Sequence, residues 1–377
     1  MRRIACAAAL GLVLSGCASL GREDVGPDPS DFQEPVAYQQ AWRANVGKQP
    51  RVAGYDLQPA VVGERVYVAG SDGKVRALDA ASGKRLWEIE LEQSPSAGPT
   101  ADAQRLIIGT REGQVVGLSA EDGRVLWRSG VSSEILAAPT LQGDLVVVHS
   151  ADGRVFSLRA DTGERDWIYD QVPPALTLRG SSRPLILGGE LVVVGLDNGK
   201  MVGLAANNGR ALWSAVVSEP SGRTDLDRMA DVDADPVAMA SVIYAVGYQG
   251  RVVAVDALSG RPLWQRDIGS HIGLAVDRVN VYVVDGESNV WALNRRNGAS
   301  VWRQQDLAAL QLTAPVVVGN YLVLGDAQGY LNWLSLDDGR LLRRESIGAP
   351  VVQAPVLDGR SLYVLTDKGL RVYRTEE

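Results

Sequence analysis

Short apolar runs of five or six residues, divided by glycine-containing turns, extend over most of the chain. Residues 105–110 and 114–119 are two such runs, and Gly113 and Gly123 follow them in the turns. Runs of this length between glycines are typical of β-strands joined by tight turns, since glycine adopts the backbone conformations that such turns require. The sequence therefore predicts an all-β protein with few helices.

One phrase of about forty residues recurs: a proline, an apolar stretch, a glycine, a strand, a second glycine and a tryptophan. The two glycine positions are always ten residues apart, and the tryptophan follows the second after four. Ser288 replaces the first glycine of the sixth copy, and Arg343 replaces the tryptophan of the seventh. The copies begin at Pro59, Pro99, Pro139, Pro184, Pro236, Leu274, Pro315 and Pro355.

The constant intervals indicate that each copy is one hairpin ladder, because a slip of one residue would turn every side chain to the wrong face. A repeat of this length with four strands is typical of a propeller blade. The eighth copy lacks its tryptophan strand, and a lone tryptophan strand at Trp42 precedes the first copy. We therefore expect an eight-bladed β-propeller of four-stranded antiparallel blades over residues 38–377, closed by pairing of the N-terminal strand with the C-terminal blade. Seven blades and a stray strand are the alternative.

The N-terminus has the features of an export signal. Arg2 and Arg3 precede a short apolar run over 4–13, and the sequence Leu-Ser-Gly-Cys ends at Cys17. This sequence resembles the lipobox of bacterial lipoproteins. The resemblance implies that residues 1–16 are removed as a signal peptide and that Cys17 is lipidated; an ordinary signal peptide with an incidental cysteine is the alternative. Residues 17–37 then form the lipidated cysteine and a flexible tether.

Composition argues against several functions. The chain has 377 residues, two cysteines, two histidines and a net charge of −7. Lys and Arg do not cluster along the sequence, so no nucleic-acid partner is expected. The scarcity of cysteine and histidine leaves little material for a metal site or for acid–base catalysis, so we expect no metal, no cofactor and no enzymatic activity.

The blade repeat is similar to that of another group of propellers. Residues 77–87 and 254–264 resemble the Ala-x-Asp-x-x-Thr-Gly-x-x-x-Trp motif of quinoprotein propellers. The resemblance supports the blade type and leaves a periplasmic quinoprotein-type dehydrogenase as an alternative function. Those enzymes carry a vicinal cysteine pair beside the quinone, which this chain lacks.

Three connections between blades are unusually long, and they follow Trp42, Trp167 and Trp213. The last two leave adjacent blades, so we expect them side by side on one face of the ring. Loops inserted on a rigid scaffold often carry binding residues. Leu176 and Leu178 in the link after Trp167 would form an apolar anchor, and Arg179 could bond a carboxylate or a carbonyl. The alternatives are that the leucines pack only their own loop and that acidic residues of the link after Trp213 pair within the protein.

The lipobox, the tether, the eight blades and the chain length together resemble the BamB family, a lipoprotein subunit of the machinery that inserts β-barrels into the outer membrane of Gram-negative bacteria. Residues 176–182 and 227–236 carry this resemblance best.

The resemblance implies a non-catalytic scaffold, anchored on the periplasmic face of the outer membrane, that assists β-barrel folding and insertion. It implies binding to the periplasmic POTRA domains of BamA, and indirect contact with the other subunits of the complex. It leaves open whether nascent barrels also bind, and a glycan-binding propeller is a third candidate. The implied contact residues are Leu176, Leu178, Arg179, Asp231 and Asp233.

Overall fold

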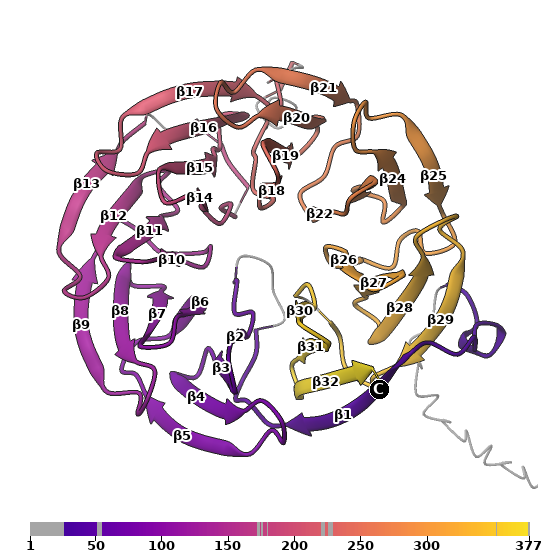
Figure 1. Ribbon diagram of the computed structural model, residues 1–377, viewed down its shortest axis with the longest axis horizontal. Coiled ribbons are helices and arrows are strands. Elements are labelled where there is room, and N and C mark those ends of the chain that lie inside the picture. The colour runs from indigo at the N-terminus through magenta and orange to yellow at the C-terminus, as the bar shows by residue number, and fades with distance from the viewer. Residues whose placement is uncertain are drawn as a thin grey trace, which may run out of the picture.

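The computed structural model is a ring of eight sheets around a central axis, each made of four antiparallel strands (Figure 1). A short 3-10 helix, η1, spans Pro29–Asp31, and the described residues contain no helix long and apolar enough to cross a membrane. Cys17 and the expected signal peptide lie outside the described residues. The structure describes residues 26–50, 55–171, 174, 176–178, 180–219, 223–224, 229–351 and 353–375.

The first four blades follow the predicted copies of the repeat, and each runs from an inner to an outer strand. Blade 1 consists of β2 (Ala60–Val62), β3 (Arg65–Ala69), β4 (Lys74–Asp79) and β5 (Arg85–Glu90). Blade 2 consists of β6 (Pro95–Ala101), β7 (Arg105–Thr110), β8 (Gln114–Ser119) and β9 (Val125–Gly130). Blade 3 consists of β10 (Thr140–Gln142), β11 (Leu145–His149), β12 (Val155–Arg159) and β13 (Arg165–Tyr169). Blade 4 consists of β14 (Leu185–Leu187), β15 (Leu191–Gly195), β16 (Lys200–Ala205) and β17 (Ala211–Val216).

The remaining blades repeat this order, and the last takes its outer strand from the N-terminus. Blade 5 consists of β18 (Val237–Met239), β19 (Val242–Val246), β20 (Val252–Asp256) and β21 (Pro262–Arg266). Blade 6 consists of β22 (Gly273–Val276), β23 (Asn280–Val284), β24 (Val290–Asn294) and β25 (Ser300–Gln304). Blade 7 consists of β26 (Val316–Val318), β27 (Tyr321–Gly325), β28 (Tyr330–Ser335) and β29 (Leu341–Ser346). Blade 8 consists of β30 (Val356–Asp358), β31 (Ser361–Thr366), β32 (Gly369–Thr375) and β1 (Tyr38–Ala44).

The two ends of the chain close the ring. Strand β1 pairs antiparallel with β32, from Tyr38 opposite Thr375 to Ala44 opposite Leu370. Figure 1 shows these strands side by side although they come from opposite ends of the sequence. The predicted eight-bladed propeller is confirmed, and the seven-blade alternative is wrong.

The apolar core is divided among the eight junctions between neighbouring blades. At seven of them, a tryptophan of the outer strand donates its indole N–H to a carbonyl of the next blade. Trp87, for example, donates to the Ala120 carbonyl at 3.2 Å. A Cβ atom on Gly123 of the same turn would lie 2.8 Å from the Trp87 ring, so only glycine lets the ring approach. The expected packing of these tryptophans between blades is confirmed.

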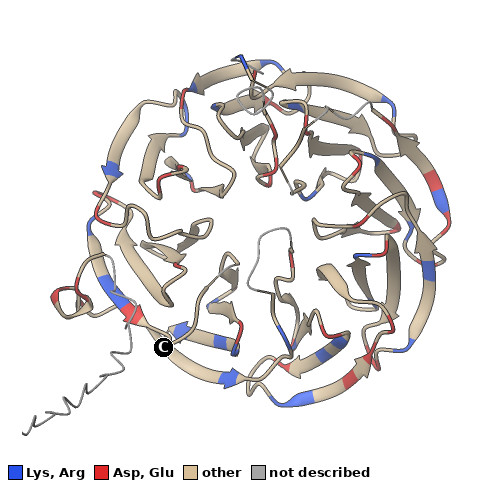
Figure 2. Cartoon of the chain, turned by 180° about the vertical axis from the view of Figure 1, so that it is seen from behind, with Lys and Arg blue, Asp and Glu red and all other residues tan. Residues whose placement is uncertain are grey.

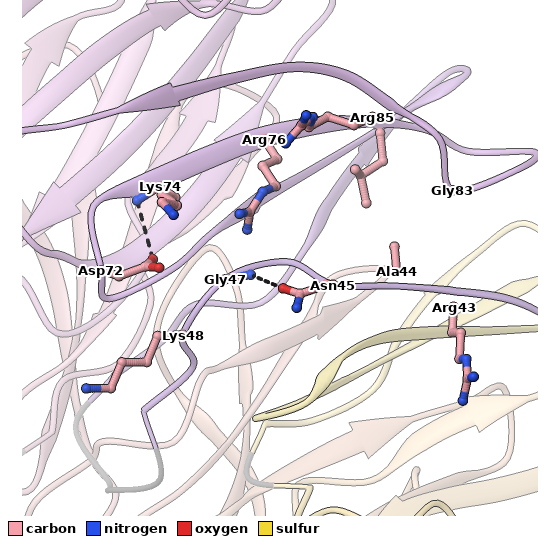
Figure 3. Close-up of a pocket in the computed structure, with 11 residues that line it drawn as sticks. Arg43, Ala44, Asn45, Gly47, Lys48, Asp72, Lys74, Arg76, Gly83 and Arg85 are labelled. Carbon is pink, nitrogen blue, oxygen red and sulfur yellow. Dashed lines mark hydrogen bonds between the residues drawn. The ribbon is translucent and has the colours of Figure 1, made fainter.

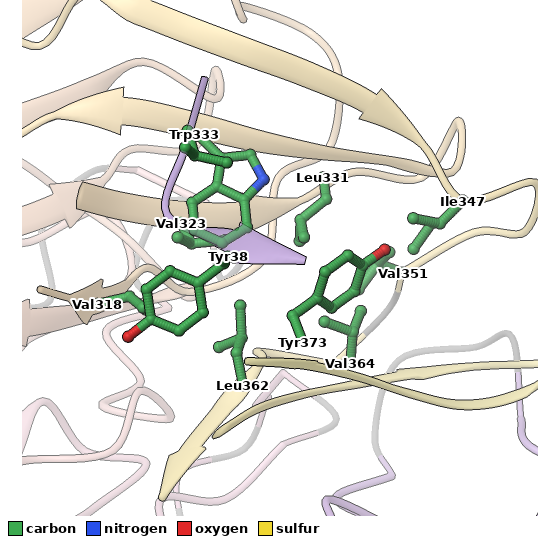
Figure 4. Packing of buried hydrophobic residues seen from close by; sticks show 11 residues of the cluster. Tyr38, Val318, Val323, Leu331, Trp333, Ile347, Val351, Leu362, Val364 and Tyr373 are labelled. Carbon is green, nitrogen blue, oxygen red and sulfur yellow. The ribbon is translucent and has the colours of Figure 1, made fainter. Parts of the chain in front are cut away.

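The junction between blades 7 and 8 has the tryptophan on a different strand. In blades 1 to 6 a small residue of the third strand faces the outer-strand tryptophan, but in blade 7 Trp333 of the third strand faces Arg343. Trp333 is fully buried, and the centroid of its ring lies 5.6 Å from that of Tyr38 and 6.5 Å from that of Tyr373 (Figure 4). At the other seven junctions, the carbonyl that accepts the indole N–H lies in the next blade, in the turn between its third and outer strands. In blade 8 no turn joins these strands, because β32 and β1 are the two ends of the chain.

The segment before β1 differs from the expected tether over residues 26–37. The Glu34 amide donates to the Leu342 carbonyl at 3.0 Å, and the Arg344 amide donates to the Phe32 carbonyl at 3.2 Å. These bonds lie along the outer edge of β29, so the segment covers backbone groups that would otherwise face solvent. The expectation of a free tether up to residue 37 is therefore wrong for this part.

Candidate functional site

The two long links, one after β13 and one after β17, lie in contact. The Leu178 amide of the first link donates to Oδ2 of Asp231 in the second. A Cβ atom on Gly180 would lie 2.7 Å from Oδ2 of Asp233, so the two backbones approach closely there as well. The predicted adjacency of the two links is confirmed; we call them the paired links.

The expected contact residues differ in exposure. Leu176 is 45% exposed, Leu178 and Asp233 are half-buried, and Asp231 is fully buried. Arg179 lies outside the described residues. Leu176 therefore exposes apolar surface to solvent. Asp231 has no exposed surface and instead holds the backbone of the first link, so the prediction that it contacts a partner directly does not fit its burial.

Three carboxyl groups gather where the paired links meet the β15–β16 turn. Burial, and then the charges of Asp231 and Asp152, raise the pKa of Asp197 to about 7. Burial, and then the charges of Asp231 and Asp197, raise the pKa of Asp233 to about 8. Burial also raises the pKa of Asp231, although the amide N–H of Leu178 favours its charged form. Neutral pH therefore falls within the titration range of this cluster.

A second polar network holds the far ends of the paired links. The Arg183 guanidinium bonds Oδ2 of Asp56 at 2.9 Å, and the Arg183 amide donates to Oδ1 of Asp235 at 2.7 Å. The amide of Ala138 donates to the same Asp56 oxygen at 2.8 Å. Asp56 belongs to the long link after Trp42, so this link connects blade 3 to both paired links. Sequence reasoning missed the network, and the length of that link was the one available signal.

The two histidines take part in structural contacts. His149 is fully buried, its Nδ1 lies 3.1 Å from the Ser182 carbonyl, and burial lowers its pKa, so the ring is neutral and donates from Nδ1. His271 packs edge-on against Tyr248 at 6.0 Å. Among the residues that the structure describes, no group of three or more His, Cys, Asp or Glu side chains could hold a metal ion.

Comparison with solved structures shows the same architecture in proteins of different activity. The structure of BamB from Moraxella catarrhalis superimposes with a TM-score of 0.83 at 26% identity, covering 89% of this chain and 99% of that one. A quinohemoprotein alcohol dehydrogenase from Pseudomonas putida superimposes with a TM-score of 0.73 at 14% identity, covering 90% of this chain and 76% of that one. The second likeness shows the fold alone.

Sequence comparison identifies the family. A family model described as outer membrane protein assembly factor BamB matches residues 38–96 and 71–304. The outer membrane protein assembly factor BamB of Alkalilimnicola ehrlichii is 55% identical over 369 residues, which cover 98% of this chain and 95% of that protein. The Pseudomonas aeruginosa protein of the same name is 44% identical over 369 residues, with 97% of both chains covered. The chain therefore belongs to the BamB family of outer membrane protein assembly factors.

Proposed function

We propose that this chain is a non-catalytic scaffold of the outer-membrane protein assembly machinery and that the paired links bind the POTRA domains of BamA. The observation that carries the proposal is an exposed leucine on a braced loop. Leu176 is 45% exposed, while the neighbouring Leu178 amide is held by the buried Asp231. An apolar side chain close to a backbone amide that is already hydrogen-bonded loses little conformational entropy on binding, which favours affinity.

The arrangement of the ring supports the same role. The paired links connect blades 3, 4 and 5, and Figure 1 shows these blades as neighbours. The polar network of Arg183 holds the ends of both links, so the ring presents them as one surface. The contact set proposed from the family resemblance is Leu176, Leu178, Arg179, Asp231 and Asp233, with Asp231 acting through the backbone it holds.

The cellular location follows from the N-terminus. We propose that residues 1–16 are removed, that Cys17 is lipidated, and that the propeller is held at the periplasmic face of the outer membrane. Two or more acyl chains are enough for stable anchoring. Mass spectrometry of the protein purified from membranes tests this: a lipid-modified Cys17 at the N-terminus is expected, and an unmodified mature chain would contradict it.

Co-purification with BamA tests the binding site. Leu176→Asp should abolish capture of BamA, because a charge would have to be buried against an apolar partner surface. The matched control is Leu258→Asp: Leu258 is 85% exposed in the β20–β21 turn, at the opposite face of the ring. The control should capture BamA normally. Equal capture by both variants would place the BamA contact elsewhere, and loss of capture in the control alone would place it on the opposite face.

A further inference from the structure

A basic hollow lies at the junction of blades 8 and 1, between the end of β1 and blade 1 and next to the β1–β32 pair; we call this junction the closing seam. Its volume is about 760 Å³. Figure 3 shows its lining side chains, and Figure 2 shows basic segments on the strands beside the C-terminus, where the ring closes. The charged residues that line it are Arg43, Lys48, Lys74, Arg76, Arg85 and Asp72. Five cations in one hollow stand out in a chain whose net charge is −7.

Arg76 is the buried centre of this lining. Its side chain is 10% exposed, and its Nε donates to Oε2 of Glu88 at 2.6 Å. Arg85 donates to the same Glu88 oxygen at 2.7 Å, so one carboxylate serves two guanidinium groups. Nη1 of Arg76 has no hydrogen-bond partner among the described residues, and the guanidinium points toward Gly47 and Asn45 (Figure 3). Nη1 is enclosed against Gly47, so an oxyanion in the hollow would be held by the other cations of the lining and by the positive charge of Arg76.

The blade repeat does not require a charge at this position. Arg76 lies seven residues before the turn glycine Gly83, and none of the equivalent residues in blades 2 to 7 is charged. Those equivalents are Val116, Phe156, Val202, Val253, Trp291 and Asn332. In blade 8 the residue in the same register is Arg371, but its guanidinium donates to the Gln40 side chain and the Ile347 carbonyl, so Arg76 is the one of the two arginines with an unsatisfied donor.

The junction between blades 2 and 3 provides an internal comparison. A smaller hollow of about 440 Å³ lies there, with Phe156 in the place of Arg76. Its two cations are Arg154 and Arg165, and Arg154, the counterpart of Lys74, is held by Asp152 at 2.8 Å and by Asp170 at 3.1 Å. Two carboxylates thus balance the two cations at that seam, whereas the closing seam keeps an excess of positive charge.

The charge balance indicates the ligand class. Asp72 and Glu88 lie at the basic hollow and Glu90 stands opposite Lys74 in the β4–β5 pair, so its five cations leave an excess of two positive charges. Arginine presents a planar fork of donors that matches two oxygens of a phosphate, and a dianion matches an excess of this size better than one carboxylate does. We propose that the basic hollow binds a phosphate-type oxyanion, either free or as the head group of a phospholipid.

The site is separate from the paired links. Figure 1 places β1, β4 and β5 on the opposite side of the ring from β17 and β18. The propeller would then bind its protein partner through the paired links and a phosphate-type oxyanion through the basic hollow, on the other side of the ring. The interaction is expected to weaken with salt, since several of the cations are exposed and screened.

Isothermal titration calorimetry of the full chain in non-ionic detergent tests the proposal. The probes are inorganic phosphate, monomeric dihexanoyl phosphatidylglycerol, and dihexanoyl phosphatidylcholine as the zwitterionic control. We expect one phosphate-containing anion bound per chain and no binding of the control lipid. Arg76→Val, which installs the blade 2 residue, should weaken binding by roughly tenfold or more, the effect of removing a buried and weakly screened positive charge beside the anion.

A second pair of variants keeps the test independent of folding. Lys48→Ala changes an exposed residue and should weaken binding about threefold by removing one partly screened cation, while Arg154→Ala at the blade 3 counterpart should leave it unchanged. Binding of inorganic phosphate identifies a free anion as sufficient, and binding of the anionic lipid alone identifies the head group. Failure of both probes to bind, or equal affinity of Arg76→Val and the unaltered chain, would overturn the proposal.

Discussion

Replacing the buried Asp231 by alanine should loosen the link that carries Leu176 without altering Leu176 itself. Asp231 is fully buried, and its Oδ2 accepts the Leu178 amide. Leaving that amide without an acceptor costs about 1–3 kcal/mol. Asp231→Asn keeps an oxygen acceptor, and burial already favours the uncharged acid at this position, so it should cost well under half as much.

Hydrogen exchange and affinity together measure this effect. A cost of 1–3 kcal/mol corresponds to roughly 5- to 150-fold faster exchange of the Leu178 amide when exchange follows local opening. Asp231→Ala should also weaken binding of a purified BamA POTRA fragment, by no more than the same factor, because the loop must be ordered again on binding. Leu176→Ala should do the opposite: it should weaken binding and leave exchange at Leu178 unchanged.

The variants separate a positioning role from a contact role. Unchanged exchange at Leu178 in Asp231→Ala would refute the bracing argument. Equal losses of affinity in Asp231→Asn and Asp231→Ala, with exchange near normal in both, would show that the carboxylate itself touches the partner. Exchange in the β20–β21 turn on the other face should stay constant in every variant.

The other predictions concern stability. Trp127→Phe removes the 2.8 Å bond to the next blade and should lower the free energy of unfolding by about 1–3 kcal/mol in urea denaturation. Arg343→Trp restores the tryptophan of the repeat but should not raise the free energy of unfolding. A rise as large as the fall caused by Trp127→Phe would contradict our account of the junction between blades 7 and 8. Arg344 forms an ion pair with the buried carboxylate of Asp326. Arg344→Ala leaves that carboxylate without its cation and should lower the free energy of unfolding by about 3–5 kcal/mol; an unchanged urea midpoint would show that the pair contributes nothing to stability. The raised pKa values of Asp197 and Asp233 stabilise the folded protein fully below about pH 4, and this contribution should decline with rising pH and be lost above about pH 7 to 8. Thermal midpoints between pH 5 and pH 9 should show this decline, and the double Asn variant should flatten it.

Several features could be predicted because they repeat. The ten-residue glycine interval set the register of every blade, since a slip in one copy would disturb its cross-strand pairs. The lone strand at Trp42 and the incomplete last copy predicted the closure that β1 and β32 form. The unequal link lengths predicted that the links after Trp167 and Trp213 would lie side by side.

Other features could not be read from the repeat because they depend on contacts between distant segments. Nothing near Phe32 in the sequence shows that it follows the outer edge of β29. In blade 7 the tryptophan stands on the third strand and Arg343 takes its place on the outer strand, next to a blade that has no turn between its third and outer strands. The burial of Asp231 depends on a link that begins in another blade.

The sequence by itself determined the blade type, the number of blades, the closing strand and the family, because each of these follows from local periodicity or from motifs that survive without coordinates. The tertiary structure decided which residues of the paired links face outward, which carboxyl groups are buried together, and where cations gather at the closing seam. The exposure, burial and electrostatic environment of a side chain depend on residues that are distant in the sequence and that the closed ring brings into contact with it. Arg76 illustrates the difference: in the sequence it is one substitution in a repeat, and in the ring it is a buried cation with an unused donor.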